Sequence, residues 1–257
     1  MARPQSSLRG NEENIEGVDI MLAIDVSSSM LAEDFSPNRL EAAKKVATDF
    51  VSGRTSDRIG IVVFSGESFT QCPLTIDHNI LKTQIDAIKS GMLEDGTAIG
   101  EGLATAINRL KSSSAISKTI ILLTDGVNNR GSIDPISASE LAKTFGIRVY
   151  TIGVGTRGMA PYPVQTPFGK QYIQEEVQID EDMLKQAADN TGAKYFRATN
   201  KNSLQNIFQE IDKMEKSKIE VTAYERKSEE FALFLWFALG IFVVELLLRL
   251  TAFRSIP

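Results

Sequence analysis

Residues 18–29, VDIMLAIDVSSS, join a run of apolar residues to an acid and a row of hydroxyls. The run from Val18 to Ile24 is almost continuously apolar, as is typical of a strand that is buried on both faces of a parallel sheet. Asp25, Ser27 and Ser29 follow it at alternate positions. Ligands of open α/β sheets bind outside the carboxyl ends of the strands, so this segment predicts a strand that ends at a ligand site.

The rest of the chain alternates between strand and helix patterns. Further apolar runs predict strands at 58–64, 119–123 and 149–154, with a weaker one at 194–196. Helical patterns lie between and after them, at 38–52, 80–90, 99–111, 135–145, 181–190 and 203–214. This alternation indicates an α/β fold with a doubly wound, mostly parallel sheet that is covered by helices on both faces. We expect an extra edge strand within 65–75 and a long loop or hairpin at 155–173.

Composition restricts the kind of site that this chain can build. Its formal net charge is −5, with no basic block, which argues against binding to duplex nucleic acid. The single cysteine, Cys72, excludes an intramolecular disulfide and a thiolate cage, and the single histidine, His78, excludes a multi-histidine zinc site. We expect Cys72 on an edge strand and His78 at the start of a helix. Any metal must therefore be bound by oxygen.

Two other segments should bring oxygen atoms to the same edge of the sheet as Asp25. Thr124-Asp125-Gly126 ends another strand, and Asp95-Gly96-Thr97 precedes a helix. Two carboxylates at one edge repel each other unless a positive charge lies between them. The predicted metal ligands are Asp25, Ser27, Ser29, Thr97 and Asp125. An all-oxygen set suits Mg²⁺, with Mn²⁺ or Ca²⁺ as other occupants.

The neutral hydroxyls of this set leave part of the metal charge unbalanced, so the ion should attract a carboxylate from a partner protein. A purely structural interpretation stays open, in which Ser27 and Ser29 cap the next turn and Asp125 forms an Asx-turn. Two functional alternatives are a scaffold whose metal only ties strand ends together and a Mg²⁺-dependent phosphohydrolase with Asp25 as nucleophile. Phosphohydrolases of the haloacid dehalogenase type carry a second acid two residues after the nucleophile, where this chain has Ser27. The sequence therefore favours a binding module and not an enzyme.

The Asp25-x-Ser-x-Ser run, together with Thr97 and Asp125, resembles the metal-ion-dependent adhesion site of von Willebrand factor type A domains, over about residues 17–215. The segments SMLAEDFSPNRLEAAK and LEDGTAIGEGLATA are similar to those of BatA-type (Bacteroides aerotolerance) membrane proteins. This resemblance implies a Rossmann-like domain in which Ser27, Ser29 and Thr97 bind Mg²⁺ directly. Asp25 and Asp125 would act mainly through water, and a partner's Glu or Asp would complete the coordination.

The same resemblance implies partners and a cellular setting. BatA-type proteins are expected to work beside sibling Bat proteins and a MoxR-type AAA+ ATPase in envelope maintenance or stress tolerance. No G-x-x-x-x-G-K-[ST] motif occurs here, so the ATPase would be a separate chain. Residues 153–158 match the dinucleotide fingerprint G-x-G-x-x-G, but no helix is expected after them, which argues against nucleotide binding.

The C-terminal region predicts attachment to a membrane. Residues 231–250, FALFLWFALGIFVVELLLRL, carry only Glu245 and Arg249 as charges, and a helix of this length reaches about 30 Å. We therefore divide the chain into a linker (1–16), the domain (17–215), a juxtamembrane linker (216–230), a transmembrane helix (231–250) and a tail (251–257). The predicted location is the bacterial inner membrane. The domain would be periplasmic if apolar helices precede it, as in BatA-type proteins, and would otherwise face the cytosol.

Overall fold

The computed structural model describes residues 18–54, 57–167, 169–225 and 231–251. Its main feature is a six-stranded sheet of order β3-β2-β1-β4-β5-β8. The strands are β1 (Val18–Asp25), β2 (Arg58–Phe64), β3 (Ser68–Thr75), β4 (Ser117–Thr124), β5 (Ile147–Val154) and β8 (Tyr195–Ala198). Neighbouring strands are parallel except β2 and β3. The expected mostly parallel sheet, with an extra edge strand at β3, is therefore confirmed.

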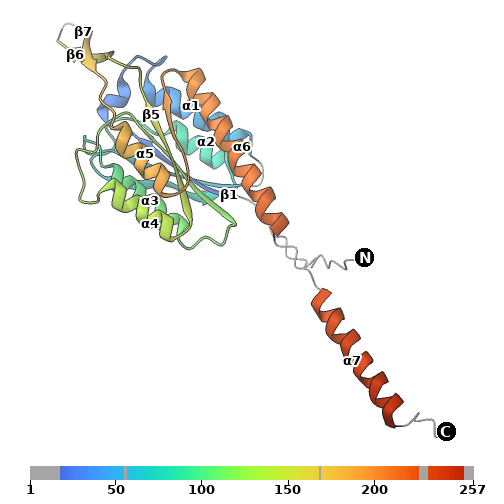
Figure 1. Ribbon diagram of the computed structural model, residues 1–257. Coiled ribbons are helices and arrows are strands. Elements are labelled where there is room, and N and C mark those ends of the chain that lie inside the picture. The colour runs from blue at the N-terminus through green and yellow to red at the C-terminus, as the bar shows by residue number, and fades with distance from the viewer. Residues whose placement is uncertain (1–17, 55–56, 168, 226–230, 252–257) are drawn as a thin grey trace. The chain divides into compact units, whose positions relative to one another are not determined.

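Helices cover both faces of this sheet (Figure 1). They are α1 (Arg39–Ser52), α2 (His78–Asp86), α3 (Ile99–Leu110), α4 (Pro135–Thr144), α5 (Glu181–Asn190) and α6 (Lys201–Glu225), with a short 3-10 helix, η1 (Ser28–Leu31). Met21 and Ala23 of β1 pack in one core with α3, α4 and α5. On the other face, Phe50 of α1 meets Phe208 of α6, with ring centroids 5.1 Å apart. Burial of such side chains contributes about 1.5–3 kcal/mol each.

One of the expected segments is confirmed as a hairpin, and one expected helix is longer than predicted. The segment expected as a loop or hairpin forms a hairpin of β6 (Met159–Thr166) and β7 (Gly169–Glu176), which lies outside the main sheet. The helix predicted at 203–214 is longer, because α6 continues to Glu225 through part of the predicted juxtamembrane linker. His78 begins α2, and Cys72 is buried in β3, as expected.

The chain divides into two compact units, of which Ile15–Lys216 holds the sheet. The other unit holds α7 (Phe231–Thr251), and the described side chains of α7, residues 235–248, are all exposed. In the described part of the chain, no helix is long and apolar enough to cross a membrane. The membrane span predicted at 231–250 is therefore not confirmed. The predicted linker at 1–16 lies outside the described residues.

Candidate metal site

Asp25 is fixed at the carboxyl end of β1 by two hydrogen bonds. Its Oδ1 accepts from the backbone N–H of Ser27 at 2.9 Å, and its Oδ2 accepts from the hydroxyl of Thr124 at 2.6 Å. Thr124 ends β4, which pairs in parallel with β1, so the two strands deliver their polar residues to one edge of the sheet. The side chain of Asp25 is fully buried, and both its oxygens are used for these contacts.

The hydroxyls of Ser27 and Ser29 lie beside each other at the start of η1. Ser27 precedes the first residue of η1, and the short helix turns the two Oγ atoms to a separation of 3.0 Å. Ser29 Oγ also donates to Asp125 Oδ1 at 2.7 Å. Oxygen ligands at about 2.0–2.1 Å from an octahedral metal are about 3 Å from their neighbours. The spacing of these two hydroxyls therefore fits adjacent ligands of a small divalent cation.

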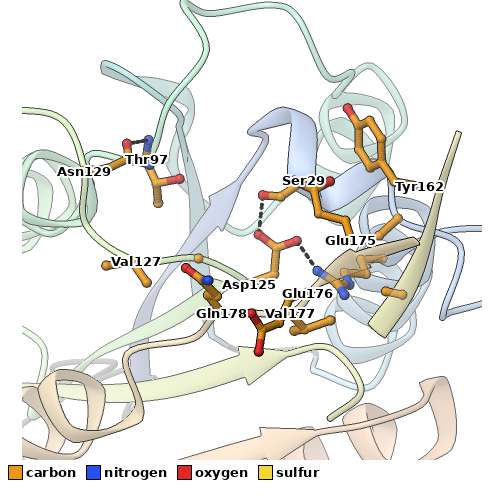
Figure 2. Close-up of a pocket in the computed structure, with 14 residues that line it drawn as sticks. Ser29, Thr97, Asp125, Val127, Asn129, Tyr162, Glu175, Glu176, Val177 and Gln178 are labelled. Carbon is orange, nitrogen blue, oxygen red and sulfur yellow. Dashed lines mark hydrogen bonds and ion pairs between the residues drawn. The ribbon is translucent and has the colours of Figure 1, made fainter. Parts of the chain in front are cut away.

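Thr97 reaches the same place from the loop before α3. Its backbone N–H donates to Asn129 Oδ1 at 2.9 Å, and its carbonyl accepts from the backbone N–H of Asn129 at 3.0 Å. The residue is only 4% exposed, and its hydroxyl has no hydrogen-bond partner among the described residues. Thr97 lines a cavity of about 380 Å³ together with Ser29 and Asp125 (Figure 2). A hydroxyl at a cavity wall without a described hydrogen-bond partner is available to bind a cation.

Thus the structure brings the five predicted residues to one edge of the sheet. Ser27, Ser29, Asp25 and Asp125 belong to one hydrogen-bonded group, and Thr97 faces it across the cavity. Within the described residues, no group of three or more His, Cys, Asp or Glu side chains is placed to hold a metal. That two acids and three hydroxyls at this edge bind a metal stays a prediction.

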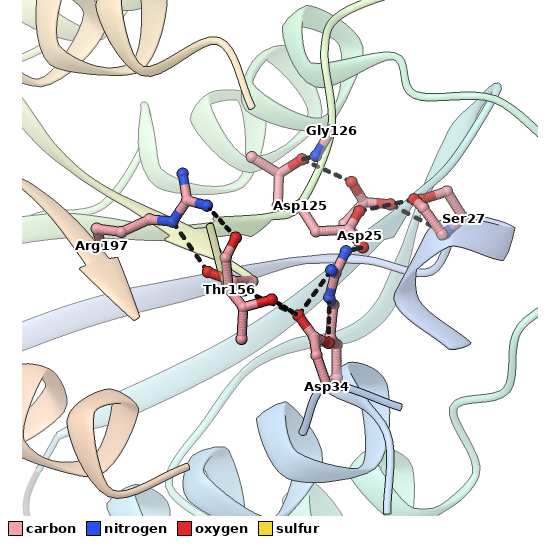
Figure 3. Close-up of polar contacts among 11 residues, drawn as sticks. Asp25, Ser27, Asp34, Asp125, Gly126, Thr156 and Arg197 are labelled. Atoms are coloured by element: carbon pink, nitrogen blue, oxygen red, sulfur yellow. Dashed lines mark hydrogen bonds and ion pairs between the residues drawn. The ribbon is translucent and has the colours of Figure 1, made fainter. Parts of the chain in front are cut away.

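Arg39 is a residue of this site that the sequence analysis missed. Its Nη1 donates to Asp125 Oδ2 at 2.7 Å, while Nε and Nη2 donate to the two oxygens of Asp34 at 2.7 and 2.8 Å. Asp34 in turn accepts from the backbone N–H of Thr156 at 2.8 Å (Figure 3). A cation in the first turn of a helix, where the helix dipole disfavours it, is the one sequence signal that could have indicated a buried partner.

The site carries more negative than positive charge. Burial and the neighbouring Asp125 raise the pKa of Asp25 to about 7. Burial also raises the pKa of Asp125, although Arg39 acts in the opposite direction. The guanidinium of Arg39 pairs with Asp125 and Asp34, whereas Asp25 accepts its hydrogen bonds from Ser27 and Thr124. A divalent cation beside Ser29 and Thr97 would relieve the remaining repulsion.

The G-x-G-x-x-G segment has a structural explanation. Gly155 has φ +149°, and a Cβ at this position would lie 3.1 Å from Cζ of Arg39. The segment is followed by β6 and not by a helix, so no helix N-terminus faces it. Gly155 therefore makes room for the guanidinium that pairs with Asp125.

Comparison with known proteins relates this chain to Bat proteins. BatB from Bacteroides thetaiotaomicron is 35% identical, with a TM-score of 0.68, over 78% of this chain and 100% of that chain. An aerotolerance-related membrane protein from Bacteroides fragilis is 33% identical, with a TM-score of 0.66, over 77% of this chain and 100% of that chain. The chain spans about 59% of the length of bacterial relatives that are 32% and 34% identical to it.

A more distant structure has a metal at the corresponding type of site. Proximal thread matrix protein 1 from the mussel byssus, with a zinc-occupied MIDAS (metal-ion-dependent adhesion site) motif, is 25% identical, with a TM-score of 0.60, over 77% of this chain and 45% of that chain. The family model of the von Willebrand factor type A domain matches residues 19–210, which contain the six-stranded sheet except Val18 and all five predicted ligands. The chain therefore belongs to the von Willebrand factor type A domain family.

Proposed function

We propose that this chain is a binding module that holds Mg²⁺ at the edge of its sheet and captures a carboxylate of a partner protein. Ser27, Ser29 and Thr97 bind the ion directly in this proposal, and Asp25 and Asp125 act mainly through water. The partner's Glu or Asp takes the position that faces the cavity. The ion supplies the positive charge that attracts this carboxylate.

The hydroxyl of Thr97 is the observation that carries this proposal. Thr97 is only 4% exposed, its hydroxyl has no hydrogen-bond partner among the described residues, and the residue lines a cavity with Ser29 and Asp125. A hydroxyl at a cavity wall that no described protein group uses is available as a ligand to an ion bound there. The cavity gives a partner access to the ion, which a metal that only tied strand ends together would not need.

The surroundings of Asp25 argue against hydrolysis of a phosphate ester at this site. Both carboxylate oxygens of Asp25 accept hydrogen bonds, and the side chain is fully buried behind the hydroxyls. A nucleophile must instead reach the reacting phosphorus atom. Ser27 also stands where enzymes of the haloacid dehalogenase type have their general acid and base.

The setting that we propose is a Bat/MoxR-type complex of envelope maintenance or stress tolerance at the bacterial inner membrane. The similarity to BatB and to an aerotolerance-related membrane protein supports it. The exposed apolar side chains of α7, among them Trp236 and Phe237, support attachment to a membrane. Cell fractionation tests the attachment, and protease protection on spheroplasts tests the side on which the domain lies.

Titration calorimetry of the full chain with Mg²⁺ tests the metal site. We expect Ser29→Ala and Ser27→Ala to weaken Mg²⁺ binding strongly. Ser28→Ala is the matched control, because the hydroxyl of Ser28 lies between these residues in sequence but donates to Asp95 at 2.8 Å instead. Equal Mg²⁺ affinity in all three variants would refute the metal site.

Capture of candidate partners tests the second half of the proposal. A purified MoxR-type ATPase and sibling Bat proteins are offered to the immobilised full chain in Mg²⁺ and in EDTA. We expect binding in Mg²⁺ that is lost in EDTA and in the Asp25→Ala variant. Equal binding in both buffers would contradict capture through the metal.

A further inference from the structure

We infer that the β6–β7 hairpin forms the second half of the binding surface and selects a partner segment in which the metal-binding acid is flanked by a basic residue. This inference rests on the proposed function, because it concerns what the same cavity accepts. In this inference the hairpin residues that line the cavity opposite the predicted metal ligands determine which partner segments bind. Four observations on the hairpin support it.

The hairpin and the segment after it make one wall of the cavity. Ser29, Thr97 and Asp125 lie on the side of the sheet edge, and Tyr162, Glu175 and Glu176 lie on the side of the hairpin (Figure 2). A partner carboxylate that approaches the ion must therefore pass beside the hairpin. The residues next to that carboxylate in the partner will contact the hairpin wall.

The hairpin is held in this position by Glu33, in the segment between η1 and α1. The backbone N–H of Glu33 donates to the carbonyl of Pro161 at 2.8 Å. Its carboxylate accepts from Lys170 at 2.5 Å and from the hydroxyl of Tyr172 at 2.9 Å. These three contacts engage both strands of the hairpin, so its position relative to the metal ligands is defined.

A second connection links the start of the hairpin to the metal site itself. Thr156 precedes β6 and binds Asp34, Asp34 binds Arg39, and Arg39 binds Asp125 (Figure 3). The wall that a partner contacts and the acid beside the ion therefore belong to one hydrogen-bonded group. This connection gives the hairpin a fixed place at the site.

Charge identifies the partner's chemistry. Glu175 and Glu176 are exposed and form no ion pair with any described residue, whereas Glu33, Asp34 and Asp125 each pair with a Lys or Arg. Two unpaired acids repel a carboxylate that enters alone, and like charges across an interface suppress binding. A Lys or Arg next to the metal-binding Glu or Asp removes this repulsion by pairing with the hairpin. The favoured ligand is therefore a segment that carries adjacent charges of both signs.

A displayed peptide library tests this inference on the full chain. Each peptide has a central Glu with randomised neighbours, and selection is run in Mg²⁺ and in EDTA. We expect the Mg²⁺-dependent binders to be enriched in Lys and Arg beside the central Glu. The double variant Glu175→Lys/Glu176→Lys should reverse the preference to Asp and Glu, and should slow association of a Lys-flanked peptide by about tenfold at low ionic strength.

The control variant is Asp86→Lys/Glu140→Lys, which makes the same change in net charge at two exposed acids outside the cavity. It should keep the preference of the unmodified chain. Mg²⁺-dependent binders without basic neighbours, or a preference that the hairpin variant leaves unchanged, would overturn the inference and leave the proposed function standing. Absence of any Mg²⁺-dependent binder would count against both.

Discussion

Arg39 Nη1 lies 2.7 Å from Asp125 Oδ2, and both side chains are almost fully buried. The same guanidinium binds both oxygens of Asp34, so one cation holds two acids from different segments. Paired buried charges are tolerated, but an unpaired one is costly. Arg39 therefore holds Asp125 in place at the candidate metal site.

Replacement of Arg39 by an apolar residue of similar size should lower the free energy of unfolding. Arg39→Met leaves Asp34 and Asp125 without their shared partner, and we expect the free energy of unfolding to fall by about 3–5 kcal/mol. Urea denaturation in EDTA measures this loss. Arg58→Met is the control, because Arg58 pairs with Asp19 but its side chain is 45% exposed, so a smaller loss is expected. Equal losses would show that burial of the Arg39 pair is unimportant.

Removal of the hydroxyl of Thr97 should weaken Mg²⁺ binding without lowering the stability of the domain. Thr97→Val keeps the shape of the side chain, and the lost hydroxyl has no hydrogen-bond partner among the described residues. We expect Mg²⁺ affinity to fall by about tenfold or more, as for groups that support metal ligands. Stability in EDTA should stay the same or rise. Calorimetry and denaturation on the same sample test both statements, and unchanged Mg²⁺ affinity would exclude Thr97 as a ligand.

Loss of the carboxylate of Glu33 should loosen the hairpin locally. Glu33→Gln removes the ion pair with Lys170, and amide hydrogen exchange over β6 and β7 should become faster. The midpoint of thermal unfolding should change little, because exposed ion pairs contribute little to global stability. Glu140→Gln, at an exposed acid on α4, is the control and should leave hairpin exchange unaltered. Unchanged exchange in Glu33→Gln would mean that other contacts hold the hairpin.

The alternation of strands and helices along the chain could be predicted from hydrophobic periodicity. The range 58–64 matches β2, and 181–190 matches α5, because apolar runs and amphipathic helices repeat at short range. The meeting of Asp25 and Asp125 could also be predicted, because parallel strands end at one edge of a sheet.

The contacts around these ligands could not be predicted in this way. Arg39 and Asp125 are 86 residues apart in sequence, and their pairing depends on where the fold places the first residue of α1 relative to the end of β4. The hairpin strand β7 is exposed along its whole length and mostly polar, so it lacks the apolar alternation of a strand packed on a core. α6 continues past residue 214 as a charged helix, and no turn signal in the sequence indicates where it ends.

Glu215 provides a test of the fold at the opposite end of β4 from the metal site. This carboxylate of α6 is fully buried and accepts hydrogen bonds from Ser117, Thr119, Arg148 and Tyr150, among them that of the Tyr150 hydroxyl at 2.7 Å. Burial alone would raise the pKa of Glu215, but Arg148 and the hydroxyl donors outweigh it and lower the pKa below its ordinary value of 4.5. The charged form is therefore favoured in the folded state.

The sign of the pH dependence follows from this lowered pKa. The stabilisation by Glu215 is present above the pKa of the unfolded chain, about 4.3, and is lost as the pH falls through the lower pKa of the folded protein. We expect Glu215→Gln to reduce the free energy of unfolding at pH 7 by about 3–5 kcal/mol, because Arg148 is left without its partner. This difference from the unmodified chain should shrink as the pH falls below about 4.3. Urea denaturation over this pH range measures it, with the exposed Glu210→Gln as control. A difference that stays constant down to low pH would mean that Glu215 is not charged in the folded protein.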